Sequence, residues 1–135
     1  MIEEKYVNLE IAKLLKEKGF DEPCECFYDT EHNNISIVNG WMVTSNSQLD
    51  EREFLCYSAP TLQMTIDWLL EVHHYYIQVM LDSWACGEHM GYYVLIQRTD
   101  NDFEIMLSDF VDNVFYEKPE YAYNDAIKYI LENLI

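Results

Sequence analysis

The chain has 135 residues, of which 25 are Asp or Glu and 8 are Lys or Arg, so its formal net charge at pH 7 is −17. This charge argues against unassisted binding to DNA, RNA or an anionic membrane, because each of them requires a basic face on the protein. It is compatible with a basic protein partner, with mimicry of nucleic acid, or simply with solubility. Half of the residues are hydrophobic, which predicts a globular protein, and the length predicts one domain over residues 1–135.

The N-terminus and the cysteines bear on location and on metal binding. No apolar run reaches the length of a membrane span and the N-terminus lacks the features of a signal peptide, so we expect a cytoplasmic protein with reduced thiols. Cys24-x-Cys26, with Cys56 and Cys86, lacks the Cys-x2-Cys spacing of structural zinc and has no second pair. We therefore predict no metal and no other cofactor.

The first predicted element is a helix with an apolar stripe made by Val7, Ile11, Leu14 and Leu15. Asn8 is its expected N-cap. Gly19 is expected to end it, with Phe20 folding back on Leu15 as in a Schellman motif.

Residues 21–57 carry weaker signals. Residues 25–28 predict a short edge strand. Residues 35–38 and 41–44, joined by Asn39-Gly40, predict a β-hairpin, because Asn-Gly is the preferred pair for a type I′ turn. The polar segment 45–53 predicts an exposed loop.

A central helix is predicted to run from near Pro60 to His73, since proline fits the first turn of a helix. Either Ser58 or Thr61 can supply the capping oxygen. The apolar stripe consists of Leu62, Ile66, Leu69, Leu70 and His73, widened by Met64, Trp68 and Val72. After His73-His74 the period becomes alternating, which predicts a strand over 75–81.

The rest of the chain predicts strands over 92–98 and 103–107, an irregular segment over 109–117 and a last helix that Pro119 opens. The stripe of this helix consists of Tyr123, Ile127, Ile130, Leu131 and Leu134. The predicted fold class is α+β in the order α-β-β-α-β-β-β-α. It comprises a three-stranded antiparallel meander and an N-terminal hairpin, packed against the central and C-terminal helices.

Pairing Leu81 with Tyr92 across the loop sets the two faces of the meander. The core face, which the two helices should cover, then carries Tyr75, Ile77, Val79, Leu81, Tyr92, Val94, Ile96, Phe103, Ile105 and Leu107. The opposite face carries six interface candidates beside Glu104 and Met106: Tyr76, Gln78, Met80, Tyr93, Leu95 and Gln97. It is more apolar than a solvent face should be, so either the first helix and the hairpin cover it or another subunit does.

Signatures of catalysis are missing from the sequence, which has no GxSxG, Walker A, HExxH or dinucleotide-binding motif. Cys86 and His89 share one loop and are candidates for a thiol dyad, but nothing orients the histidine. His73 and His74 are expected to lie about 20 Å from that loop, because a strand rises ~3.3 Å per residue. We predict no catalytic residues.

Two segments, 6–20 and 58–73, resemble a set of small proteins from Bacteroides-type gut bacteria and their phages and integrated elements. The run 121–135 is similar in pattern, so the resemblance covers about a third of the chain. That set has no assigned function, so the resemblance implies no activity and no site residues.

The leading hypothesis is a non-catalytic acidic accessory protein of phage or mobile-element origin. It would act by contact with a partner protein, and its negative charge is compatible with a basic partner. It would also form a homodimer through the face with Tyr76, Met80, Tyr93 and Leu95. One alternative is a nucleic-acid mimic that blocks a basic DNA-binding protein. The other is a small thiol or hydrolytic enzyme that uses Cys86 and His89.

Overall fold

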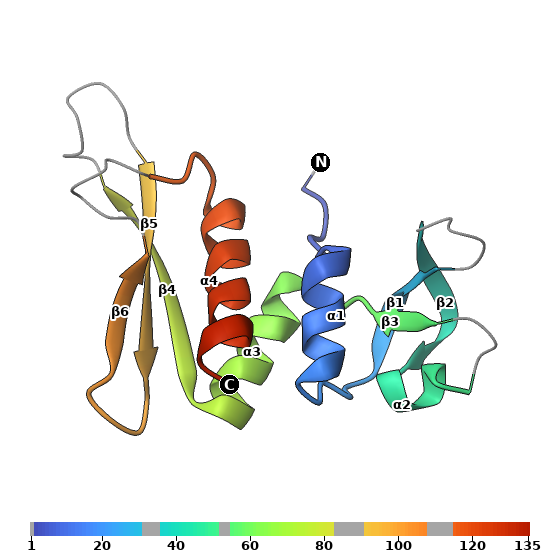
Figure 1. Cartoon of the computed structure of the whole chain (residues 1–135). Helices are drawn as coiled ribbons and strands as arrows, with labels where there is room; N and C mark the ends of the chain where they lie inside the picture. The colour runs from blue at the N-terminus through green and yellow to red at the C-terminus, as the bar shows by residue number, and fades with distance from the viewer. Residues whose placement is uncertain (1, 31–35, 52–54, 83–90, 108–114) are drawn as a thin grey trace. The chain divides into compact units, whose positions relative to one another are not determined.

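The computed structural model of the chain describes residues 2–30, 36–51, 55–82, 91–107 and 115–135. Within these residues it contains four helices and two three-stranded antiparallel sheets, which confirms the α+β class (Figure 1). Contacts between Cα atoms group the chain into two compact units. One consists of residues 1–64 with Ile135, and the other of residues 65–134.

Helix α1 (Leu9–Glu17) begins and ends as its sequence predicts. The Asn8 side chain accepts a hydrogen bond from the backbone N–H of Ile11 at 2.9 Å, which satisfies one of the unpaired donors of the first turn. Gly19 has a φ of +89°, and the Phe20 N–H donates to the Leu15 carbonyl at 2.9 Å. The Schellman motif is therefore confirmed, and Phe20 is buried.

Strand β1 (Cys24–Asp29) is the middle strand of the first sheet, which has the order β2-β1-β3. It pairs antiparallel with β2 (Ser36–Thr44) on one side and with β3 (Cys56–Ser58) on the other. The prediction of an edge strand over 25–28 is therefore wrong. Both partners come from later in the chain, and β3 is too short to show a period in the sequence.

The hairpin predicted at Asn39-Gly40 is also wrong, because both residues lie inside β2. Thr44 lies opposite Cys24 and Asn39 lies opposite Cys26, so the register shifts over the four residues between Asn39 and Thr44. Glycine in a strand is used at such bulges as well as in tight turns. The β1–β2 pairing thus places Gly40 in an irregularity of the ladder.

Helix α2 (Asn46–Leu49) replaces part of the exposed loop predicted over 45–53. Ser45, Asn46 and Leu49 are buried. The backbone N–H of Ser45 donates to Oε1 of Gln48 at 2.9 Å, as at the start of a capped helix. A single helical turn with one apolar residue is too short to show a helical period, and this explains the error.

Helix α3 (Leu62–His73) follows β3. Thr61 is its cap, because its Oγ1 accepts from the Met64 N–H at 3.0 Å, so Pro60 lies before the helix and not in its first turn. Thr65, Trp68 and Leu69 are buried, whereas Val72, predicted to widen the stripe, is 52% exposed. The buried stripe of α3 is thus rotated toward Thr65. Because threonine is a polar residue, its burial could not be inferred from hydropathy.

The second sheet has the order β4-β5-β6 and the register that the sequence predicts. Strand β4 (Tyr75–Asp82) pairs with β5 (Gly91–Arg98), with Val79 opposite Val94 and Ile77 opposite Ile96. Strand β6 (Glu104–Leu107) pairs with β5 on its other side. The predicted meander is confirmed.

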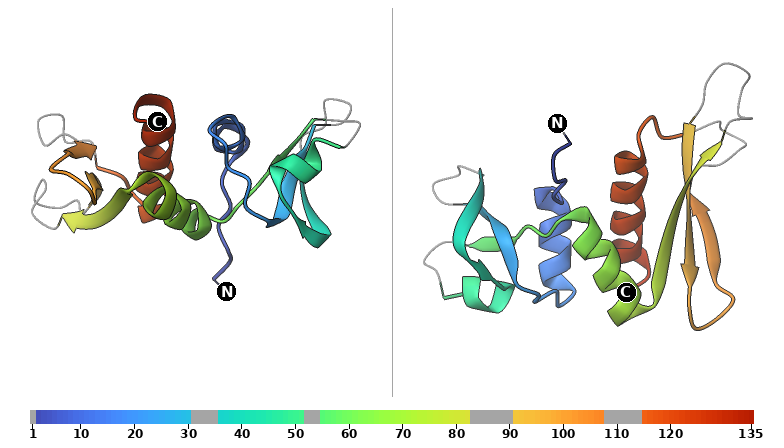
Figure 2. Two further views of the ribbon diagram at one scale, coloured as in Figure 1. Left: turned by 90° about the horizontal axis from the view of Figure 1, so that it is seen from below. Right: turned by 180° about the vertical axis from the view of Figure 1, so that it is seen from behind.

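Helix α4 (Pro119–Asn133) has Pro119 in its first turn, as predicted, and packs against β4 and β5. Figures 1 and 2 show it along one face of this sheet. Its buried residues are Ala122, Ala126, Ile127, Ile130 and Leu131, and those of the sheet are Tyr75, Ile77, Val94 and Ile96. Leu81 (52% exposed) and Phe103 (36% exposed) were predicted to lie in this core but do not, because Leu81 lies next to the last residue of β4 and Phe103 precedes β6.

Candidate functional site

The six interface candidates lie on the face of sheet β4-β5-β6 opposite to the buried residues of its core. We call this surface the open face, and it consists of Tyr76, Gln78, Met80, Tyr93, Leu95 and Gln97. Tyr76 is 44% exposed, and Met106 beside it on β6 is 42% exposed. The other five candidates are half-buried. Among the described residues of this unit, no helix lies on the open face (Figure 2).

The contacts within the open face are between neighbouring strands. The Tyr93 hydroxyl donates to Sδ of Met80 at 3.5 Å, and Nε2 of Gln97 donates to Glu104 at 3.5 Å. All six residues are uncharged. The open face is therefore a neutral, partly apolar surface on a chain with a formal charge of −17.

The candidates for catalysis are only partly covered by the structure. Cys86 and His89 lie outside the described residues. His73 ends α3, where its ring contacts Trp68 edge-on at 4.7 Å between ring centroids. Burial, followed by the nearby His74 and Arg98, lowers the pKa of His73, which favours the neutral imidazole. His73 is thus packed as part of the helix end.

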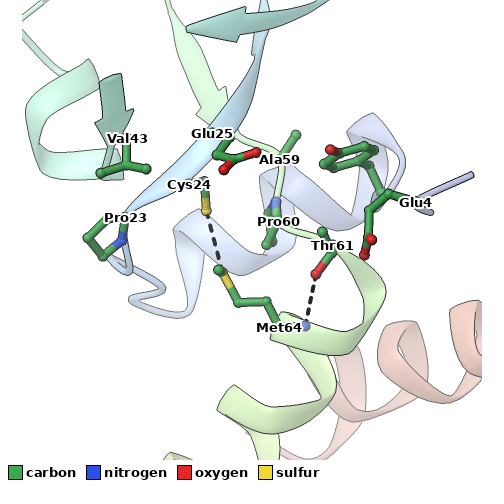
Figure 3. Close-up of a pocket in the computed structure, with 10 residues that line it drawn as sticks. Glu4, Pro23, Cys24, Glu25, Val43, Ala59, Pro60, Thr61 and Met64 are labelled. Carbon is green, nitrogen blue, oxygen red and sulfur yellow. Dashed lines mark hydrogen bonds between the residues drawn. The ribbon is translucent and has the colours of Figure 1, made fainter. Parts of the chain in front are cut away.

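Sequence reasoning did not identify a cavity of about 530 Å³ in the unit of residues 1–64. It is lined by Glu4, Tyr6, Pro23, Cys24, Glu25, Val43, Ala59, Pro60, Thr61 and Met64 (Figure 3). These residues come from the N-terminal segment, β1, the end of β2 and the start of α3. An isolated bridge between Tyr6 and Thr61 holds the N-terminal segment against the start of the helix.

Sulfur and apolar groups form the inner wall of this cavity. Cys24, Ala59 and Pro60 are buried. The Cys24 thiol contacts Sδ of Met64 at 3.8 Å, as Figure 3 shows. Burial raises the pKa of Cys24 to about 11, with a smaller opposing effect of Ser58, so the thiol is protonated at neutral pH. A protonated buried thiol is a poor nucleophile and a poor metal ligand.

The rim of the cavity is acidic. Glu4 and Glu25 are exposed, and among the residues that the structure describes no Lys, Arg or His belongs to the lining. The pKa of Tyr6 is raised, first by a hydrogen bond to Cys26, and also by the Glu25 and Glu4 carboxylates. The Tyr6 hydroxyl therefore lies in a region of negative potential.

The cavity could not be found from the sequence, because its lining residues lie up to 60 positions apart and follow no motif spacing. Among its lining residues, the sequence pointed to Cys24 through the cysteine spacing, to Pro60 and Thr61 through the helix start and to Met64 through the apolar stripe, but to no shared site. In the described part of the chain, no group of three or more His, Cys, Asp and Glu residues is arranged to hold a metal ion.

Comparison of the chain with protein-family models, curated proteins and solved structures finds no match. Among the helices of the described residues, none has both the length and the apolar character needed to cross a bilayer.

Proposed function

We propose that the protein is a non-catalytic interaction protein that forms a homodimer through the open face. The observation that carries the proposal is the absence of charge from all six residues of that face, in a chain with 25 carboxylates. Interface centres are depleted of charge and enriched in tyrosine and methionine, and the open face has two tyrosines and one methionine. Met106 and the charged Glu104 lie beside it on β6.

Electrostatics favours this face over the rest of the surface. Two copies that each carry −17 repel one another, and the repulsion at contact is smallest where the contact itself is neutral. The same charge attracts a basic protein partner and opposes an acidic one or a nucleic acid. Mutual contact of two open faces therefore brings few like charges together, with Glu104 beside each face.

The size of the face indicates a weak dimer. Strands rise ~3.3 Å per residue and lie ~4.8 Å apart, so three strands with the length of β4 present at most about 400 Å². A stable interface buries roughly 800 Å² on each partner. We therefore expect a reversible dimer that strengthens as salt is added, because salt screens the repulsion between the two chains without weakening an apolar contact.

The test is the molar mass by sedimentation equilibrium over a range of protein concentrations, in about 0.02 M and about 0.3 M NaCl, where the Debye lengths differ about fourfold. The mass should rise from monomer toward dimer with concentration, and more steeply in high salt. Tyr76→Glu should hold the chain monomeric, since it adds a pair of like charges at the contact.

The matched control is Tyr121→Glu on α4, where the tyrosine is 46% exposed against 44% for Tyr76. It adds the same charge outside the open face and should leave the association unchanged. A strict monomer at every concentration would overturn the proposal, as would equal loss of association in both variants.

A further inference from the structure

We propose that the cavity of residues 4–64 binds an organic cation, an ammonium or guanidinium group on an apolar stem. This inference is independent of the dimer, because the described lining residues all belong to the unit of residues 1–64 and none of them belongs to the open face.

The cavity has the size and the mixed lining of a ligand site. Its volume of about 530 Å³ lies within the range of roughly 300–1,000 Å³ for small-molecule pockets, which are mostly apolar with a few placed polar groups. The apolar groups come from Pro23, Val43, Ala59, Pro60 and Met64. They can cover a methylene stem, and the thioether of Met64 adapts to irregular shapes.

The polar groups of the lining match a positive charge. Glu4 and Glu25 supply carboxylates, and within the described residues neither forms an ion pair. Tyr6 adds an aromatic ring, whose face attracts cations. In Figure 3, Pro23 and Val43 lie at one end of the site and Glu4 at the other, with Glu25 between them, so a stem and a charged head have separate places.

An anion is disfavoured, although the start of α3 contributes Thr61 and Met64 to the lining and a helix N-terminus normally attracts negative charge. The N–H of Leu62 donates to the Lys5 carbonyl at 2.9 Å, and that of Met64 donates to Thr61 at 3.0 Å. These donors are already used. The two carboxylates would also repel an anion.

A metal cation fits less well than an organic one. Hard metals need several oxygen ligands. Among the described residues, Glu4 and Glu25 do not form part of a group of three or more His, Cys, Asp or Glu that could hold a metal ion. Soft metals need a thiolate, whereas Cys24 is a buried, protonated thiol.

The test is methyl NMR, which follows the methyl groups of the buried Ala59 and the half-buried Met64 while a probe is added. The probes are 1,5-diaminopentane as a free amine, and N-acetyl-lysine methylamide and N-acetyl-arginine methylamide as mimics of a basic protein. Neutral 1-pentanol is the matched uncharged probe. We expect saturable shifts with the cations below about 10 mM, and affinity at least tenfold weaker for 1-pentanol.

A double variant and a control variant test whether the carboxylates of Glu4 and Glu25 bind the positive charge of the probe. Glu4→Gln with Glu25→Gln should weaken binding of the cations at least tenfold, whereas Glu17→Gln, on the exposed surface of α1, should change it less than twofold. Both glutamates of the cavity are exposed, so the double variant should fold normally, which thermal unfolding checks.

The results distinguish a basic side chain of a protein partner from a free amine, and they show whether the proposal fails. Binding of all three cations supports a basic side chain of a protein partner as well as a free amine, and binding of 1,5-diaminopentane alone supports a free amine. Equal affinity for 1-pentanol, insensitivity to the double substitution, or no binding of any probe overturns the proposal, whatever the oligomeric state.

Discussion

The amide of Asn46 accepts a hydrogen bond from the backbone N–H of Ser58 at 2.9 Å, while its Nδ2 donates to the carbonyl oxygen of Phe20 at 2.7 Å. Asn46 is 4% exposed and Ser58 is fully buried. One side chain of α2 therefore satisfies two backbone groups, one just after α1 and one on β3. Such buried backbone groups are costly to leave without partners.

Substitution Asn46→Ala should lower the free energy of unfolding by about 2–4 kcal/mol. It removes the partner of the buried Ser58 N–H, at ~1–3 kcal/mol, and the hydrogen bond to the Phe20 carbonyl, at ~1 kcal/mol. Urea unfolding measures the change. The control Asn133→Ala removes an asparagine that is exposed and bonds only within its own helix, to the Tyr129 carbonyl, and it should cost less than about 0.5 kcal/mol. Equal effects of the two substitutions would contradict the structural role of Asn46.

His74 is the residue between α3 and β4, and its φ of +64° is positive. Its N–H donates to the Leu70 carbonyl and its own carbonyl accepts from the Thr99 N–H, so its backbone is held in place by bonds that any side chain permits. Glycine adopts this conformation without strain. We expect His74→Gly to raise the free energy of unfolding by about 0.5–1 kcal/mol and His74→Val to lower it by about 1–2 kcal/mol.

Chemical denaturation of the two His74 variants and of His74→Asn checks this prediction. The asparagine variant should lie near the wild type, since asparagine also tolerates the left-handed conformation. If His74→Gly lowered the free energy of unfolding as much as His74→Val, the imidazole side chain and not the backbone conformation would determine stability at this position.

Gly91, the first residue of β5, packs against Phe115. A Cβ added at Gly91 would overlap the Cβ of Phe115, whereas one added at Gly19 meets nothing within 4 Å. Gly91→Ala should therefore destabilise through overpacking, by about 1–3 kcal/mol. Gly19→Ala should cost about 1 kcal/mol through its positive φ alone.

A double-mutant cycle with Phe115→Gly separates the two causes, because glycine removes the Cβ of Phe115 that the added methyl group meets. The cost of Gly91→Ala should shrink when Phe115 is already glycine. The cost of Gly19→Ala should be the same in both backgrounds. Additive effects of Gly91→Ala and Phe115→Gly would refute the close contact.

The pKa of Cys24 predicts its reactivity. Burial raises this pKa from 9.0 to about 11, so at pH 8 the thiolate fraction is about a hundredfold below that of an unperturbed thiol. Alkylation by iodoacetamide, followed residue by residue with mass spectrometry, should be slow at Cys24 in the folded protein and should accelerate up to pH 11. In urea the rate should follow the ordinary thiol pKa, and a fast reaction at pH 8 in the folded state would contradict the burial.

Several features of the fold could be predicted because they depend on residues close in sequence. The cap at Asn8 and the turn at Gly19 involve hydrogen bonds that span three to five residues. The register of β4 with β5 follows from strict alternation, since a shift of one residue would bring polar side chains such as Gln78 to the core. The surface chosen as the open face was located by the same alternation.

Features that depend on distant residues could not be predicted. Strand β1 lies in the middle of its sheet because residues 36–44 and 56–58 pair with its two edges, and Asn39-Gly40 lies inside β2 because that pairing extends past it. The cavity likewise joins residues from four separate segments.

The sequence by itself determined both ends of α1, the start of α4, the meander and its two faces, because short-range hydrogen bonds and side-chain periodicity encode them locally. Only the tertiary structure decided the place of β1, the burial of Asn46 and the acidic cavity beside Cys24. Each of these depends on hydrogen bonds and contacts between residues far apart in the chain. Such contacts contribute to the free energy of folding but produce no periodic pattern in the sequence.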